Sequence, residues 1–255
     1  MSAPVFLAES ADLSKHAVGS TYVLDGPEGR HAGVVQRRRA GERIDVVDGE
    51  GLRLRCTILD VHDAQVDLRV DEQVRDRDAA PYLVLVQALA KGDRDELAIE
   101  AATEVGVDAV IPWQASRSIV VWRGDRAARS RARWVATVRA ATKQARRARV
   151  PHVEDAVTTT TLAARTAQVV ADGGTVLVLH EEATVPLLAS DLPTAGTDHQ
   201  VLVVVGPEGG IAQDELDELV AAGAQAVRLG PHVLRTSTAG PVALALLADR
   251  LGLWA

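Results

Sequence analysis

Cysteine and lysine are scarce in this 255-residue sequence, and long hydrophobic runs are missing. The only cysteine, Cys56, excludes an internal disulfide, and its alternating position in LRLRCTILD predicts a half-buried strand residue. No apolar run approaches the roughly 20 residues that span a bilayer, and the amino-terminal MSAPVFLAES has no basic segment followed by an apolar one. We therefore expect a cytoplasmic protein without a membrane partner, with one large or two modest domains.

Acidic residues outnumber basic ones, and the net charge of −7 hides a strong asymmetry along the chain. The charges of Asp, Glu, Lys and Arg sum to −8 over residues 1–116, +10 over 117–149 and −9 over 150–255. A basic block in an acidic protein indicates polyanion binding, because each Lys or Arg that meets a phosphate releases counterions. Only three lysines accompany 25 arginines, so a solvated arginine-rich helix and a compositional bias toward arginine remain alternatives to RNA binding.

Residues 1–76 are predicted to form a small β-barrel. Short β-rich runs, STYVLDG, RIDVVDGEG, LRLRCTILDV and AQVDLRVDEQV, are divided by turns that contain Gly and Asp. The charged segment RDRDAAP (75–81) then precedes a strongly apolar run, which places the domain boundary there.

The pattern changes after this boundary to that of an α/β domain over residues 77–255. YLVLVQAL and DAVIPW read as strands around a predicted helix over 94–106, and TVLVLH, VLVVVG and AVRLG supply three more strands. A long helix is predicted over 122–151, with Trp134, Val135 and Val138 as its buried stripe. Continuous apolar strands with intervening helices indicate a parallel sheet covered on both faces.

Two glycine turns suggest a ligand site. VLVVV (201–205) runs into Gly206-Pro207-Glu208-Gly209-Gly210, and Leu229-Gly230-Pro231 leads into HVLRTSTA. A glycine turn between a strand and a helix offers free backbone N–H groups and lets a ligand approach closely. The usual phosphate motifs, G-x-G-x-x-G and G-x-x-x-x-G-K-[ST], are both missing.

Carboxylates near these turns also argue against a phosphate ligand. Glu208 stands inside the first turn, and Glu181 and Glu182 end a neighbouring strand at the same sheet edge. S-adenosylmethionine, which has an adenosine and a positive sulfonium but no phosphate, answers each feature. The alternative is that the glycines only make tight turns, that Glu208 complements a helix dipole and that the other glutamates face solvent.

Five stretches carry a family resemblance. These are HAGVVQRRRAGERIDVVDGEG (31–51), KGDRDELAIEAATEVGVDAVIPWQASRS (91–118), RWVATVRAATKQARRARVP (133–151), GPEGG (206–210) and LGPHVLRTSTA (229–239). In this order they resemble the motifs of the RsmE family, small-subunit ribosomal RNA uridine N3-methyltransferases of the SPOUT superfamily. The resemblance covers nearly the whole chain.

The resemblance implies a PUA-like β-barrel over 1–76 and a SPOUT methyltransferase domain over 77–255, with a parallel sheet and a carboxy-terminal trefoil knot. It implies S-adenosylmethionine held in the knot, a homodimer, no metal ion, and 16S ribosomal RNA as substrate, within the assembled small subunit. General topology rules argue against knots, so periodicity alone predicts an unknotted, doubly wound sheet. By carry-over, the cofactor contacts are Leu179, His180, Gly206, Glu208, Gly210, Ile211, Leu229, Gly230, Leu234 and Arg235.

Arg235 is the candidate catalytic residue. Uridine N3 carries a proton at neutral pH, and a fixed guanidinium stabilises the uracil anion at its carbonyl oxygens as the proton leaves. Arginine is too basic to accept that proton, and a ligand-positioning or structural role remains the alternative. Glu208 is conceivable as a base but is not favoured. Thr236, Ser237 and Thr238 are good helix-capping types before an apolar helix suited to core or dimer packing.

Basic residues in two regions are the candidate RNA contacts. They are Arg30, His31, Arg37, Arg38, Arg39 and Arg43 in the barrel, and Arg117, Arg123, Arg126, Arg146, Arg147 and Arg149 in the basic block. A lone histidine is more often structural, but His31 matches the first histidine of the family's pair. Lys91, Arg94, Glu96 and Glu104 also match motif positions, where ion pairs that support the fold are favoured over chemistry.

The chain departs from the family pattern at four places. Ser237 stands where the family commonly has Glu, Ala32 replaces the second histidine, Gln36 interrupts the VLR motif, and Lys143 precedes Gln144 where the family has Glu. These changes affect substrate contacts more than the cofactor loops.

Three other functions remain as alternatives. The same pocket suits a SPOUT enzyme that methylates a ribose hydroxyl or another base. A non-catalytic RNA-binding assembly factor would also keep the fold, although the retained glycine turns and Arg235 argue against it. A phosphate-binding nucleotide enzyme is disfavoured by Glu208 and by the missing loop lysine.

Overall fold

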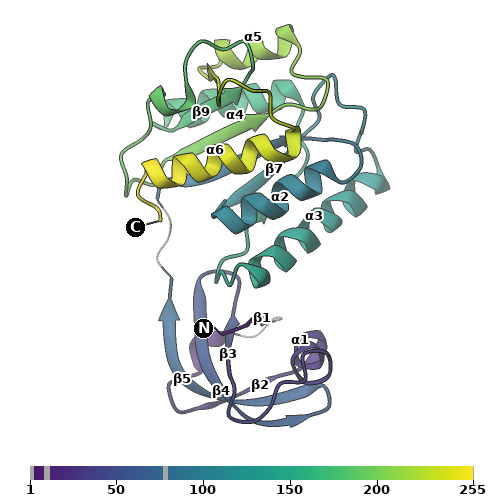
Figure 1. The fold of residues 1–255 in the computed structure, drawn as a ribbon, viewed down its shortest axis with the longest axis vertical. Helices are drawn as coiled ribbons and strands as arrows, with labels where there is room; N and C mark the ends of the chain where they lie inside the picture. Colours follow the sequence, from purple (N-terminus) through teal and green to yellow (C-terminus); the bar gives the residue numbers. More distant parts are fainter. Residues whose placement is uncertain (1–2, 9–11, 77–79, 255) are drawn as a thin grey trace. The chain divides into compact units, whose positions relative to one another are not determined.

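The computed structural model describes residues 3–8, 12–76 and 80–254, and the chain forms two compact units (Figure 1). The first unit comprises Met1–Asp78 and Thr142–Val150, and the second comprises Ala79–Ala141 and Pro151–Ala255. The boundary expected from the sequence, at residues 76 and 77, adjoins residues 77–79, which lie outside the described residues. The return of 142–150 to the first unit was not expected, because no shift in composition marks it.

The first unit is a curled five-stranded sheet in the order β1-β3-β4-β5-β2, with β1 and β3 parallel and the other pairs antiparallel. Its strands are β1 (Val5–Leu7), β2 (Thr21–Leu24), β3 (Arg43–Val47), β4 (Leu52–His62) and β5 (Gln65–Arg75). Alternating residues of β4, among them Leu54, Cys56 and Ile58, point into the core. Cys56 is only 1% exposed, so the strand assignment holds but the expectation of a half-buried thiol is wrong, because the curled sheet closes over it.

Short helical elements connect the first strands. They are η1 (Leu13–Lys15), α1 (Gly26–Arg30) and the π-helical turn η2 (His31–Val35). The returning segment 142–150 joins this unit through Ala148 and Val150, which pack against Val5, Leu7 and Val47.

The second unit contains a six-stranded sheet in the order β11-β9-β10-β6-β7-β8, and every pair in it is parallel. The strands are β6 (Tyr82–Ala88), β7 (Ala109–Trp113), β8 (His152–Val153), β9 (Thr175–Leu179), β10 (Gln200–Val205) and β11 (Gln225–Val227). The central strand β10 has five consecutive buried residues, Val201 to Val205, as expected for a strand with helices on both faces. The predicted α/β class with a parallel sheet is confirmed.

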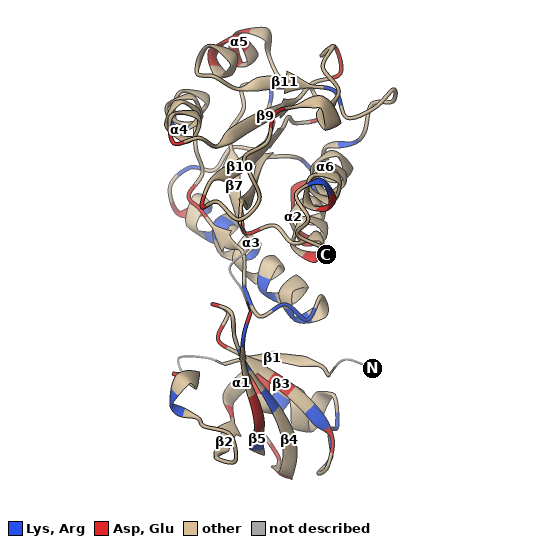
Figure 2. Cartoon of the chain, turned by 90° about the vertical axis from the view of Figure 1, so that its left-hand side faces the viewer, with Lys and Arg blue, Asp and Glu red and all other residues tan. Residues whose placement is uncertain are grey.

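Helices cover both faces of this sheet. They are α2 (Arg94–Val105), α3 (Asp125–Gln144), α4 (Thr159–Ala171), α5 (Gln213–Ala221) and α6 (Thr236–Arg250), with a short η3 (Leu187–Ala189). In Figure 2, α4 and α5 lie on one side of the strands, and α2 and α6 lie together on the other. The helix α3 is shorter than the predicted 122–151, because the backbone turns at Arg146, where φ is +57°.

The carboxy-terminal helix reaches its place by a long return path. The chain leaves the edge strand β11, passes the carboxyl ends of β9 and β10, and starts α6 beside β10 and β6. The packing is close, because a Cβ added to Gly240 would lie 2.8 Å from Leu85 Cδ1. This return path is the region in which the family resemblance implies the knot.

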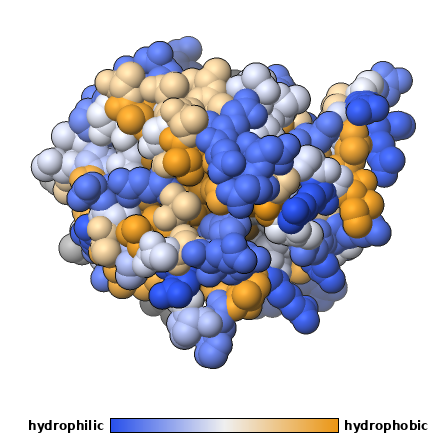
Figure 3. All heavy atoms as spheres, turned by 90° about the horizontal axis from the view of Figure 1, so that it is seen from above, coloured by the Kyte–Doolittle hydropathy of each residue, from blue (hydrophilic) through white to orange (hydrophobic). Residues whose placement is uncertain are grey.

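Two kinds of structural feature are absent from the described residues. None of their helices is long and apolar enough to cross a membrane. Within the same residues, no group of three or more His, Cys, Asp or Glu side chains is arranged to hold a metal ion. On the face shown in Figure 3, hydrophilic side chains separate the apolar ones into small patches.

Candidate functional site

A cavity of about 470 Å³ lies in the second unit, between the GPEGG loop, the second glycine turn and the start of α6. All ten residues proposed as cofactor contacts line it: Leu179, His180, Gly206, Glu208, Gly210, Ile211, Leu229, Gly230, Leu234 and Arg235. They come from the ends of β9 and β10 and from the loop that follows β11. The parallel sheet therefore brings both glycine turns to one edge, as the sequence predicted.

The glycines of these turns have distinct structural reasons. A Cβ added to Gly206 would lie 2.7 Å from Ile211 Cγ1, so the loop folds back on itself too tightly for a side chain. Gly210 has φ of +72°, a conformation that favours glycine. Gly230 is different, because an added Cβ would meet no protein atom within 4 Å. Its missing side chain leaves room beside the cavity and not within the packed protein.

Thr236 connects α6 to the first glycine turn and to β6. Its buried hydroxyl donates a hydrogen bond to the carbonyl oxygen of Gly206 at 2.7 Å and accepts one from Gln87 Nε2 at 2.8 Å. These two bonds tie the first turn of α6 to the ends of β10 and β6. Thr236 was expected to be a helix-cap residue, but it is the first helical residue and the cap position belongs to Arg235.

The carboxylate of Glu208 is held by the loop before α2. Its Oε1 accepts hydrogen bonds from the backbone N–H of Lys91 at 3.2 Å and from Arg94 Nη1 at 2.8 Å. Partial burial opposes ionisation of Glu208, but its own backbone N–H and the Arg94 guanidinium outweigh this, so its pKa lies below the ordinary value. The ion pair also confirms the supporting role expected for Arg94.

The electrostatic argument against phosphate needs correction. Glu208 is neutralised by Arg94, and Glu182 is absent from the cavity lining, so three free carboxylates do not face the ligand. Three arginines, Arg94, Arg228 and Arg235, line the cavity together with Glu181 and Glu208. The cavity therefore has mixed charge, and the missing loop lysine is the stronger reason to disfavour a phosphate ligand.

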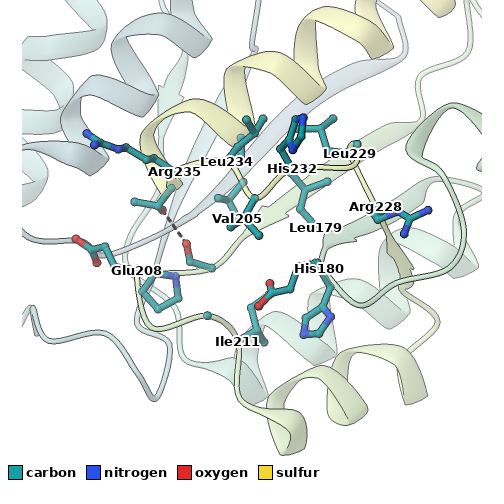
Figure 4. A pocket seen from close by; sticks show the side chains of 18 of the residues that line it. Leu179, His180, Val205, Glu208, Ile211, Arg228, Leu229, His232, Leu234 and Arg235 are labelled. Carbon is teal, nitrogen blue, oxygen red and sulfur yellow. Dashed lines mark hydrogen bonds between the residues drawn. The ribbon is translucent and has the colours of Figure 1, made fainter.

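Sequence reasoning did not single out Arg228 and His232 as lining residues. Figure 4 shows Arg235 and Glu208 toward one side of the cavity, with Arg228 on the opposite side and His232 beside Leu229. Arg228 and His232 flank the second glycine turn directly, and this adjacency is the signal that points to them. Arg235 is exposed, and within the described part of the chain its guanidinium makes no hydrogen bond or ion pair, although its backbone carbonyl accepts hydrogen bonds from Thr238 and Ala239.

A neighbouring loop supports the GPEGG turn from outside. Arg117, a candidate RNA contact, donates from Nη1 to the Gly209 carbonyl at 3.0 Å, and a Cβ added to Gly209 would lie 3.4 Å from Arg117 Cβ. The adjacent Ser116 donates from N and Oγ to the carboxylate of Glu215 at 2.9 and 2.7 Å. Thr159 also donates to Glu215, which is only 5% exposed. Arg117 is therefore positioned by the cofactor loop.

The candidate RNA contacts of the barrel lie on and after α1. Arg30, Arg37, Arg39 and Arg43 are exposed. Arg38 forms an ion pair with Glu42 at 3.1 Å. His31 forms a 2.9 Å hydrogen bond between its Nε2 and Gln36 Nε2, and it is half-buried near Phe6.

The basic block is divided between the two units. Arg123 and Arg126 are exposed in the second unit, whereas Arg146, Arg147 and Arg149 belong to the returning segment of the first. Of these three, Arg146 is the exposed one. The guanidinium of Arg149 packs over Gly51, where an added Cβ would lie 2.6 Å from Nη2, so Arg149 serves the fold.

Two of the departures from the family motifs, Lys143 and Ser237, have defined surroundings in the structure. Lys143, where the family has Glu, forms a 2.6 Å ion pair with Glu28 within the first unit. Ser237, where the family commonly has Glu, is half-buried in the first turn of α6. Glu96 pairs with Arg133 at 3.3 Å, in keeping with the supporting role expected for it.

Comparison with known proteins shows which proteins this chain is similar to. Residues 78–248 match a family model described as an RNA methyltransferase domain. The chain is 46% identical over 236 residues to ribosomal RNA small subunit methyltransferase E of Mycobacterium bovis, covering 92% of this chain and 89% of that protein. It is 30% identical over 247 residues to the Bacillus subtilis protein of that name, covering 93% and 94%.

A solved structure of a protein with that name has a similar fold. The structure of a ribosomal RNA small subunit methyltransferase E from Neisseria gonorrhoeae, bound to S-adenosyl methionine, is similar over 98% of each chain. Its TM-score is 0.84 at 27% sequence identity.

Proposed function

Because this chain belongs to the ribosomal RNA small subunit methyltransferase E family, we propose that it methylates N3 of a specific uridine in 16S ribosomal RNA. The general activity, S-adenosylmethionine-dependent methylation of small-subunit ribosomal RNA, follows from the family. The choice of uridine N3, the assembled small subunit as substrate and the residue roles below are our proposals.

One observation carries the proposal. The cavity collects both glycine turns and an arginine with no partner in the described residues, and it lies at the carboxyl edge of a parallel sheet. Open α/β sheets bind their ligands at this edge. The cavity therefore offers a cofactor cradle and a cationic group in one place.

The residues present fit S-adenosylmethionine. The volume of about 470 Å³ is within the range of roughly 300–1,000 Å³ typical of ligand pockets. Leu179, Val205 and Ile211 give an apolar wall for the adenine, while Glu181 supplies a negative charge for the sulfonium or the ammonium group. Arg228 is the lining cation for the carboxylate of the methionine part. When bound, the cofactor supplies a methyl group on a positive sulfur, ready for nucleophilic attack.

Arg235 is the proposed catalytic residue. Uridine N3 lies on the Watson–Crick edge, so the base must be unpaired before it enters the site. As N3 loses its proton, negative charge spreads to the two uracil carbonyl oxygens, where a positioned guanidinium stabilises it. Arg235 is fixed at the cap of α6 and its side chain has no competing partner in the described residues, so it is available for this role.

Glu208 is better suited to positioning than to proton transfer. Its carboxylate already accepts hydrogen bonds from Arg94 and from the Lys91 N–H. Partial burial raises its pKa, but its own backbone N–H, Arg94 and the Lys91 N–H together lower it below the ordinary value. A carboxylate with a lowered pKa is a weaker base. We therefore assign Glu208 the task of holding the GPEGG loop against the loop before α2.

Exposed residues support two further parts of the proposal, the homodimer and the RNA-binding role of the first unit. Leu97 of α2, Val242 of α6 and the terminal Trp254 are 54%, 37% and 56% exposed, which supports a homodimer formed through this region. The exposed arginines Arg30, Arg37, Arg39 and Arg43 support a PUA-like, RNA-binding role for the first unit. The cytoplasmic location is likewise a proposal, in keeping with a ribosomal RNA substrate.

The test is the identity of the methylated nucleoside. Purified protein is incubated with labelled S-adenosylmethionine and unmodified small subunits, and the RNA is digested to nucleosides for mass spectrometry. N3-methyluridine is the expected product. A 2'-O-methylated nucleoside or another methylated base would keep the enzyme class and overturn the specificity, whereas cofactor binding without transfer to any RNA would favour an assembly factor.

A further inference from the structure

The helix α3 carries three arginines on one exposed face, away from the cofactor cavity. Arg126, Arg129 and Arg133, at helical positions i, i+3 and i+7, line a shallow, open hollow together with the buried Ser130. Residues at this spacing lie on the same side of a helix. Figure 2 shows Lys and Arg residues along α3 in blue. None of the four residues lines the cavity described above.

The buried face of α3, next to the arginine face, fixes the direction of these arginines. Trp134 and Val138 are buried, at 1% and 0% exposure. The Trp134 ring packs edge-on against Trp122, with ring centroids 5.2 Å apart and an interplanar angle of 79°. Because this apolar face is locked into the core, α3 cannot turn its arginine face inward without exposing two tryptophans.

The arginine side chains of α3 differ in whether they already form hydrogen bonds or ion pairs with the rest of the protein. Arg131 bonds the backbone carbonyls of Val153 and Glu154 and pairs with Asp155 at 3.1 Å. Arg133 pairs with Glu96, although its side chain remains 67% exposed. Within the described residues, Arg126 and Arg129 have no hydrogen-bond or ion-pair partner. Like charges at helical spacing repel, so this face carries an uncompensated charge that a polyanion would neutralise.

The spacing of these arginines suits a nucleic-acid backbone. With a rise of about 1.5 Å per residue, the three arginines span roughly 10 Å of the helix. One strand of a DNA duplex presents a phosphate about every 3.4 Å along its axis. On a spacing of this order, the arginine face can contact two or three successive phosphates of an RNA strand. Guanidinium groups match phosphate geometry better than ammonium groups do.

We propose that Arg126, Arg129 and Arg133 form a docking site for the sugar–phosphate backbone of ribosomal RNA. The site deepens the proposed function, because it rests on ribosomal RNA being the substrate. Only Arg126 was a candidate contact from the sequence, and the hollow adds Arg129 and Arg133. Contacts to phosphates position an RNA without reading its sequence. The α3 site therefore orients the RNA while the cofactor cavity selects the base.

The experiment compares two double variants of the full-length protein. R126Q/R129Q removes the two arginines that have no partner in the described residues. R165Q/R250Q removes the same charge from α4 and α6, where Arg165 pairs with Glu154 and Arg250 bonds the Ser190 carbonyl. Filter binding to small-subunit ribosomal RNA over a salt series gives the affinity and the salt slope, and calorimetry with S-adenosylmethionine checks the cofactor cavity.

We expect R126Q/R129Q to bind RNA at least tenfold more weakly. The magnitude of its salt slope should fall by about 1.4–1.8, since each lost phosphate contact removes about 0.7–0.9 from it. The cofactor affinity should not change. R165Q/R250Q should bind RNA like the wild type, and R126K/R129K, which keeps the charges, should recover most of the affinity and slope. For methyl transfer, the loss in R126Q/R129Q should be in KM for subunits more than in kcat.

Three other outcomes would overturn the α3 site, the proposed function or both. A wild-type salt slope in R126Q/R129Q, or an equal loss in R165Q/R250Q, removes the α3 site but leaves the methyltransferase function standing. A wild-type protein that binds RNA through α3 but transfers no methyl group would remove the proposed function and keep the site. If the wild type binds neither the ribosomal RNA nor the assembled small subunit, both fall.

Discussion

The hydroxyl of Thr236 donates a 2.7 Å hydrogen bond to the carbonyl of Gly206, which lies thirty residues earlier in the chain. The same hydroxyl accepts from Gln87 Nε2 at 2.8 Å, so one buried side chain connects β6, the GPEGG loop and α6. The shape of the cavity therefore depends on a bond between the GPEGG loop and the first turn of α6.

Replacing Thr236 by Val should destabilise the protein and weaken cofactor binding. The change leaves the buried Gln87 amide and the part-buried Gly206 carbonyl short of a partner, which costs about 1–3 kcal/mol. Urea denaturation measures the stability and calorimetry the affinity for S-adenosylmethionine. Thr236→Ser keeps the hydroxyl and is the matched control. Equal behaviour of the two variants would show that the hydrogen bonds do not matter.

Replacing Gly230 by Val should block the cofactor and spare the fold. An added Cβ meets no protein atom within 4 Å, and φ at Gly230 lies outside the left-handed region. We expect at least a tenfold loss of S-adenosylmethionine affinity, with Gly230→Ala intermediate and with stability within about 0.5 kcal/mol of the wild type. Unchanged affinity in Gly230→Val would mean that the cofactor does not occupy this side of the cavity.

The Glu208–Arg94 ion pair should make a small, pH-dependent contribution to stability. Partial burial opposes ionisation, but the Glu208 backbone N–H and Arg94 outweigh it and lower its pKa. Since the folded pKa lies below the ordinary 4.5, the contribution is present above about pH 4.5 and is lost as pH falls through the folded pKa.

This sign is tested with Glu208→Gln. The wild type should be more stable than the variant by about 0–1 kcal/mol at pH 7, because the pair is partly exposed, and the difference should shrink in urea denaturation below pH 4. A difference that grows on acidification would contradict the account.

Cys56 should be unreactive in the folded protein. Burial in the β4 core, with smaller effects from Asp71 and Asp45, raises the pKa of its thiol to about 12. The thiolate is the reactive form, so a thiol-specific reagent at pH 8 should label the native protein slowly and the urea-unfolded protein quickly. Because Cys56 is the only cysteine, the signal has one origin. Native labelling at the unfolded rate would show that the first unit opens readily.

The sequence predicted the strands and helices of the second unit well where the pattern of apolar residues is strong. Val201 to Val205 and Leu83 to Val86 are continuous apolar runs, and both are central strands. Trp134 and Val138 are buried on α3 as their helical spacing indicated, whereas Val135, the third residue of the predicted stripe, is only half-buried. Strand direction placed Glu181 at the sheet edge of the first glycine turn, and the family resemblance supplied the ten residues that line the cavity.

Other features depend on contacts that no local pattern reveals. Segment 142–150 joins the first unit because Ala148 and Val150 pack against β1 and β3, strands that lie more than a hundred residues earlier. The neutralisation of Glu208 depends on Arg94, which lies far away in the chain. Burial of Cys56 follows from the curl of the sheet, which alternation along one strand cannot specify.

Methyl transfer from labelled S-adenosylmethionine to unmodified small subunits, with the nucleosides identified by mass spectrometry, tests the central claim most directly. Wild-type protein should form N3-methyluridine. Arg235→Ala should lose at least a hundredfold in kcat, because one preorganised charge at the developing anion contributes about 10²–10³, while its cofactor affinity changes far less. Formation of N3-methyluridine by Arg235→Ala at the wild-type rate, or its absence from the wild-type product, would contradict the account.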